Sequence, residues 1–144
     1  MIENDTVKLL RECDAGIKMG INVIDGSLDY VHSRRLKKLL KGSMKEHKAI
    51  DGNLQNLLDR YEDNGKSLPA MARIMSQVKL DFKLALNSGD HTVADFITDG
   101  CNMGIKSLSK YLNQYAAADE KSKDIAKKLI AVEEKMSVDL RDFL

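Results

Sequence analysis

Apolar residues recur at alternating steps of three and four along four long stretches of this chain, and this spacing constrains the fold most strongly. Such spacing puts apolar side chains on one stripe of an α-helix, the stripe that faces the core of a bundle. Only one proline, Pro69, stands in the 144 residues, so long helices are not interrupted. Aromatic residues make up 5% of the chain, so Leu, Ile, Met and Ala must carry the packing. The sequence therefore predicts one all-α domain covering residues 1–144.

Each of the four apolar stripes contains a polar or ionisable side chain close to its middle. These side chains are Asp14, His47, Cys101 and Glu133. Metal sites in four-helix bundles are built from inward-facing side chains of this kind. Buried polar groups can also satisfy one another through hydrogen bonds. For the nearest expected pair, Asp14 and His47, we predict an approach within hydrogen-bonding or one-water distance.

Capping residues predict two helices in the first half of the chain. Asn4 or Asp5 can cap a first helix that runs to about Asp29. Ser33 can cap a second helix that reaches about Asn64, just before a glycine. The connection between them is short, so the two helices should be antiparallel neighbours.

The last third of the chain repeats this arrangement. Asp90 can cap a third long helix that runs to about Ala116, and Asp119 can cap a fourth that continues to the C-terminus. The link between these two helices is again short. A second antiparallel hairpin is therefore expected.

About 25 residues, from Gly65 to Gly89, separate the two hairpins. Pro69 sits where a helix can begin, and apolar residues recur behind it at helical spacing. They are Met71, Ile74, Met75, Val78, Phe82 and Leu86. We expect a short helix inside a long crossover. Together with Leu80 and Leu84, these apolar side chains cannot all face one core stripe, so a homodimer is also expected.

Four patches occur in a fixed order along the chain: Asp14-Ala15-Gly16, Met71-Ala72-Arg73-Ile74-Met75, Asp99-Gly100, and Glu133-Glu134 followed by Leu140. Together with the helix order, they resemble the ferritin-like superfamily, and among its members the small rubrerythrin-related bacterial proteins. The resemblance implies a ferritin-like four-helix bundle: two antiparallel hairpins joined by a long crossover that contains an extra short helix.

Di-iron members of that superfamily carry one Glu on the first and third helices and Glu-x-x-His on the second and fourth. When this pattern is aligned with the chain, Asp14 stands at the Glu position of the first helix and Cys101 at that of the third. The second helix keeps His47 but has Met at the Glu position, and the fourth keeps Glu133 but has Met at the His position. Half of the ligand set is therefore replaced, and two carboxylates with one imidazole compensate two iron ions poorly.

Two functional hypotheses follow. The first is a non-catalytic helical bundle, with no cofactor, that acts through self-assembly or through a protein partner. The alternative is an altered site in which Asp14, His47, Cys101 and Glu133 hold a single transition metal ion. Two helical glycine pairs, Gly16 with Gly20 and Gly100 with Gly104, indicate either a close approach of helices or room for a ligand.

Charge and composition exclude several other classes. The net charge is +1, and the basic run over residues 34–41 alternates with leucines, so it is typical of a solvated helix face rather than of a nucleic-acid site. No apolar stretch approaches the length of a membrane span, and no signal peptide is evident. Two distant cysteines, Cys13 and Cys101, predict free thiols in a reducing compartment, so we expect a cytoplasmic protein.

Overall fold

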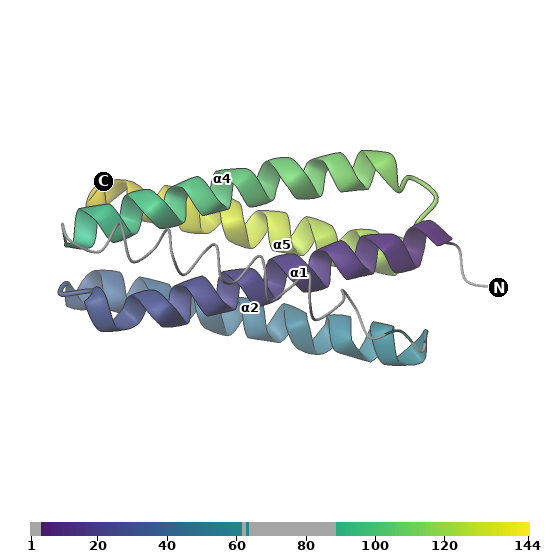
Figure 1. Ribbon diagram of the computed structural model, residues 1–144, viewed down its shortest axis with the longest axis horizontal. Helices are drawn as coiled ribbons and strands as arrows, with labels where there is room; N and C mark the ends of the chain where they lie inside the picture. The colour runs from purple at the N-terminus through teal and green to yellow at the C-terminus, as the bar shows by residue number, and fades with distance from the viewer. Residues whose placement is uncertain (1–3, 62, 64–88) are drawn as a thin grey trace.

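The computed structural model describes residues 4–61, 63 and 89–144, which form four α-helices packed side by side (Figure 1). The helices are α1 (Asn4–Ser27), α2 (Arg34–Arg60), α4 (Asp90–Gln114) and α5 (Glu120–Asp139). Two short 3-10 turns, η1 (Leu28–Tyr30) and η3 (Leu140–Phe143), continue α1 and α5. No strand occurs among the described residues, which confirms the all-α class. Within those same residues, every helix is too short or too polar to cross a lipid bilayer.

Two of the predicted helix caps are confirmed. The Ser33 hydroxyl accepts a hydrogen bond of 3.2 Å from the backbone N–H of Leu36, and the Asp119 carboxylate accepts one of 2.8 Å from Ser122. These bonds satisfy N–H groups that a helix start leaves without a partner. The predicted crossover helix, and the apolar residues expected to form a dimer contact, lie outside the described residues.

Asp90 has a different role from the predicted one. It is the first residue of α4, and the cap position belongs to Gly89, whose φ of 92° favours glycine. The Asp90 carboxylate instead accepts hydrogen bonds of 2.7 and 2.9 Å from the backbone N–H groups of His32 and Ser33. The start of α4 therefore lies beside the start of α2, and both helices run in the same direction (Figure 1). The end of α2 and the start of α4 consequently lie at opposite ends of the bundle.

Hydrogen bonds also tie the helices together at the other end of the bundle. The backbone N–H of Ala117 donates to the Asp5 carboxylate at 3.1 Å, and that of Asp119 donates to the Thr6 hydroxyl at 2.8 Å. The Tyr61 hydroxyl donates to Asp119 at 2.6 Å. The link between α4 and α5 is thus fastened to the start of α1 and to the end of α2.

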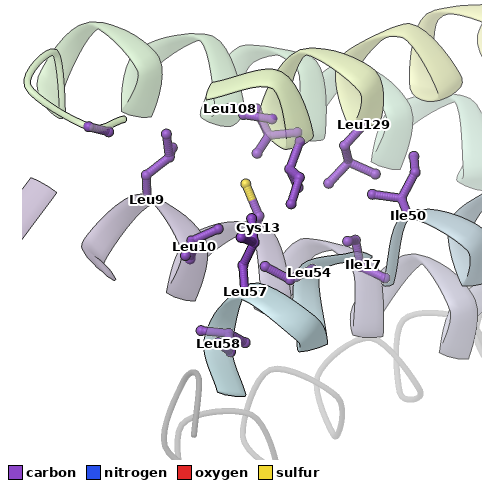
Figure 2. Close-up of a cluster of buried hydrophobic side chains, with 13 residues drawn as sticks. Leu9, Leu10, Cys13, Ile17, Ile50, Leu54, Leu57, Leu58, Leu108 and Leu129 are labelled. Carbon is purple, nitrogen blue, oxygen red and sulfur yellow. The ribbon is translucent and has the colours of Figure 1, made fainter. Parts of the chain in front are cut away.

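Helices α1 and α5 each pack against the other three helices, and their apolar stripes form two buried clusters. The first cluster fills the half of the bundle that contains the start of α1 (Figure 2). Its members are Leu9, Leu10, Cys13, Ile17, Ile50, Leu54, Leu57, Leu58, Leu108, Ala118, Ile125, Ala126 and Leu129. The second cluster fills the other half. Its members are Ile24, Val31, Leu36, Leu40, Val93, Ala94, Ile97, Cys101, Met136 and Leu140.

Candidate functional site

A polar layer separates the two apolar clusters, and each helix contributes one residue to it. On every helix, that residue falls between the members of the first cluster and those of the second. The four residues are Gly20, His47, Gly104 and Glu133. A layer in mid-bundle is therefore present, but only His47 and Glu133 of the four predicted residues belong to it, and glycines occupy it on α1 and α4.

His47 and Glu133 form a buried hydrogen-bonded pair across α2 and α5. The imidazole has no exposed surface and the Glu133 residue is only 8% exposed. His47 Nδ1 lies 2.8 Å from the Ser43 carbonyl oxygen, which can only accept, so Nδ1 carries a proton. His47 Nε2 lies 2.9 Å from Glu133 Oε1. If His47 Nε2 also carries a proton, it donates to Glu133 Oε1, and the pair is then an imidazolium and a carboxylate with no net charge.

The surroundings of His47 favour that second proton. Burial of the ring lowers the pKa of His47, but the hydrogen bond to Glu133 opposes this effect. The Ser43 carbonyl and the negative charges of Glu133 and Glu46 act in the same direction as that hydrogen bond. The net effect is a pKa above the usual range for histidine. Both ring nitrogens are therefore engaged within the protein.

Cys101 lies against the same carboxylate. Burial raises the pKa of the Cys101 thiol, and the negative charge of Glu133 together with a hydrogen bond to it raises the pKa further. The thiol is 1% exposed and stays protonated at neutral pH. A protonated thiol is a weak nucleophile and a poor metal ligand, so Cys101 acts here as a hydrogen-bond donor to Glu133.

The glycines of the layer leave space for these two side chains. A Cβ atom on Gly20 would lie 3.0 Å from His47 Nε2, and one on Gly104 would lie 3.8 Å from the Glu133 carboxyl group. A Cβ on Gly16 would meet Leu129 at 3.7 Å, and one on Gly100 would meet nothing within 4 Å. The expected close approach of helix backbones is therefore not observed at these glycines: the close neighbour of Gly20 is the imidazole of His47, and the neighbours of Gly16 and Gly104 are also side chains.

The predicted direct pairing of Asp14 with His47 is wrong. The Asp14 carboxylate is fully buried, but it accepts hydrogen bonds from Lys18 at 2.8 Å and from Gln55 at 2.9 Å. Gly20, not Asp14, is the residue of α1 that faces His47. Six residues of helix separate Asp14 from Gly20, an axial rise of about 9 Å. Asp14 and His47 each lie near the middle of their helix, but the register of α1 against α2 places them at different levels of the bundle.

The four residues predicted as metal ligands are therefore divided. His47, Cys101 and Glu133 meet in one contact network, and Asp14 belongs to another. Among the residues that the structure describes, no group of three His, Cys, Asp or Glu side chains is arranged to hold a metal ion. Both nitrogens of His47 already take part in hydrogen bonds within the protein. The di-iron site implied by the ferritin-like resemblance does not fit this set.

The other cysteine, Cys13, lies within the first apolar cluster, where its side chain points in among leucines (Figure 2). Burial raises the pKa of this thiol to about 12, and the negative charges of Glu12 and Asp14 contribute to the increase. Both cysteines are free, as the sequence predicted. The place of Cys13 in the first cluster gives it the role of a small apolar side chain.

The partners of the polar layer were not identified from the sequence. The missing signal is the register, which decides which positions of the two antiparallel helices face one another. Counted outward from His32, the middle of the link between η1 and α2, His47 falls opposite Ile17, midway between Asp14 and Gly20, so the count does not select the partner. No protein-family model, no curated protein and no solved structure was found to match this chain.

Proposed function

We propose that this chain is a non-catalytic helical bundle of ferritin-like topology that acts through self-assembly or by binding a protein partner. The observation that supports this function is the state of the polar layer. His47, Glu133 and Cys101 are buried, and both His47 and Cys101 interact with the Glu133 carboxyl group, so these polar groups serve the fold. A buried polar pair of this kind fixes the register of helices, as single polar residues do in coiled coils.

The placement of Asp90 supports the topology. Its carboxylate holds the start of α4 beside the start of α2, so the two helices are parallel. Parallel second and third bundle helices require a connection that returns along the bundle, which is the ferritin-like arrangement. A simple up-down-up-down bundle would join antiparallel helices by a short loop at one end.

The alternative function is metal binding at an altered mid-bundle site. One observation favours it, namely that three helices bring His47, Cys101 and Glu133 to the same level of the bundle. A metal ion there would have to displace the protons of the thiol and of His47. That displacement makes the alternative the weaker of the two functions.

Metal content separates these proposals. We expect protein purified without added metal to contain transition metal far below one equivalent, as measured by plasma mass spectrometry. Thermal unfolding should be the same with and without EDTA. A stoichiometric metal ion that the His47→Leu variant no longer holds would contradict the scaffold function. Sedimentation equilibrium should give a dimer, and a monomer mass at every accessible concentration would contradict self-assembly.

A further inference from the structure

The solvent face of α2 is strongly basic over residues 34–48. Seven Lys or Arg side chains occur there against a single acidic residue, Glu46. Five of the basic residues follow one another at steps of four and three along the helix and are exposed. They are Arg34, Lys38, Lys41, Lys45 and Lys48. Such steps keep side chains on one stripe, and this basic stripe is about 21 Å long.

A groove of about 350 Å³ runs between α2 and α5 beside the basic stripe. Lys38 belongs both to the stripe and to the lining of the groove. Leu39 on α2 and Val132 and Met136 on α5 supply the apolar part of the lining. A cavity of this size accommodates one or two large side chains. The surface therefore combines an apolar groove with a row of positive charge along one edge.

An unsatisfied polar atom lies in the wall of this groove. The Ser43 hydroxyl is buried and has no hydrogen-bond partner among the residues that the structure describes. Leaving such a group unpaired costs free energy, so this part of the groove wall is less stable than a fully hydrogen-bonded one. The carbonyl of the same residue accepts the Nδ1 proton of His47, so the groove wall is directly coupled to the polar layer.

We propose that the groove between α2 and α5 binds an acidic amphipathic helix of a partner protein. Carboxylates at steps of three and four on that helix match the basic stripe, and an adjacent apolar side chain enters the groove. The partner's carboxylates would face Lys38, Lys41 and Lys45. This inference rests on the proposed partner-binding function and specifies its surface and the chemistry of the partner.

The two walls of the groove favour a peptide over a uniform polyanion. The α5 wall contains Asp139, and Lys135 on that wall already pairs with Glu46 at 3.0 Å. A nucleic acid or an anionic membrane would meet the Asp139 carboxylate with like charge, whereas a peptide can present different groups to each wall. In the described part of the chain, the groove lining also lacks the aromatic side chains on which bases stack.

The first test is a charge reversal with a matched control. The probe is a fluorescein-labelled synthetic peptide of ~20 residues with Glu at steps of three and four and Leu beside them. Reversal of Lys38, Lys41 and Lys45 to Glu should weaken binding by at least ~10-fold, because the stripe then repels the peptide. The control reverses Lys121, Lys127 and Lys128, three exposed lysines of α5, and should change the affinity by less than ~3-fold.

The second test addresses the groove itself. Gly42 lines the groove and Gly52 does not, although both are exposed on α2 and a Cβ on either would meet nothing within 4 Å. Gly42→Leu should therefore obstruct the groove and weaken peptide binding by ~5-fold or more, while Gly52→Leu should leave it unchanged. Circular dichroism establishes that each variant is folded.

Three results would overturn the proposal: no binding of the peptide to the unaltered protein, equal losses in the α2 and α5 variants, or tighter binding of oligouridylate or phosphatidylserine vesicles than of the peptide. These outcomes leave the proposed scaffold function standing when the protein is metal-free and dimeric. A stoichiometric metal ion in the purified protein would instead contradict that function, whether or not the peptide binds.

Discussion

His47 Nε2 lies 2.9 Å from Glu133 Oε1, and this contact joins α2 to α5 across 86 residues of sequence. It is the central bond of the polar layer, with Gly20 and Gly104 facing it from the other two helices. The pair is buried, the Ser43 carbonyl accepts the Nδ1 proton of His47, and the Cys101 thiol lies against the Glu133 carboxyl group. Its energetic role can be tested by removing each partner alone and both together.

His47→Leu should lower the free energy of unfolding by about 3–5 kcal/mol, because it leaves the Glu133 carboxylate buried without its partner. The double variant with Glu133→Leu should be more stable than the sum of the single effects by about 0.5–3 kcal/mol. Urea denaturation of the three variants measures both quantities.

In the matching cycle, His47→Leu is combined with Asp14→Leu. The two losses in unfolding free energy should add, since Asp14 bonds Lys18 and Gln55 and not His47. Strong coupling in the Asp14 cycle would contradict the observed pairing.

Alanine at the two layer glycines should have opposite effects. At Gly20, the added Cβ would lie 3.0 Å from His47 Nε2, and the ring cannot move away without losing its bonds to Ser43 and Glu133. We expect a loss of about 1–3 kcal/mol. At Gly104, the new contact of 3.8 Å is an ordinary one, so the gain in helix propensity of up to about 1 kcal/mol should remain. Thermal unfolding compares the two, and a destabilised Gly104→Ala would argue against this account of the layer.

Stability should decrease as the pH rises above the ordinary histidine value of 6.5. Burial alone would lower the pKa of His47, but the hydrogen bond to Glu133 and the other contacts raise it. Between 6.5 and that raised pKa, the folded protein binds more protons than the unfolded chain, so the free energy of unfolding falls with increasing pH. Below that range, the contribution of His47 is fully present. Urea titrations at several pH values should show this slope, and His47→Gln should flatten it.

Neither thiol should react readily in the folded protein. Burial raises the pKa of Cys13 to about 12, and burial with the charge of Glu133 raises that of Cys101, so both remain protonated at pH values near 8. Ellman's reagent should therefore label both cysteines in urea and neither of them quickly under native conditions. Single Cys→Ala variants assign any residual rate. Rapid native labelling of Cys101 would show that the layer opens to solvent.

The helix positions and the burial of His47 and Glu133 in mid-bundle followed from the sequence because both depend on local patterns. The three- and four-residue spacing predicted the buried faces, and the side chains of Ser33 and Asp119 cap α2 and α5 as expected. The partners within the layer depend on the relative register of helices, which the apolar spacing does not determine. For that reason Glu133, rather than Asp14, is the partner of His47.

Asp90 illustrates the same limit at the end of the bundle. An acidic residue that follows a glycine looks like the cap of its own helix, and only the contact of the start of α4 with the residues just before α2 reveals its other role. The burial of the Ser43 hydroxyl and the groove beside it could not be predicted from the sequence either, since both depend on the spacing between α2 and α5. Side chains that act between helices are thus the ones that sequence patterns place least well.

The bonds from His32 and Ser33 to Asp90 also determine when the first hairpin can be complete. During synthesis, the residues of α1 and α2 emerge well before the carboxylate that satisfies these two N–H groups. Until α4 docks, the entry to α2 is held by the Ser33 side chain and by the first backbone bond of the helix, from Lys37 to Ser33, and is open to fraying. The first hairpin therefore gains its two bonds to Asp90 only when α4 is in place.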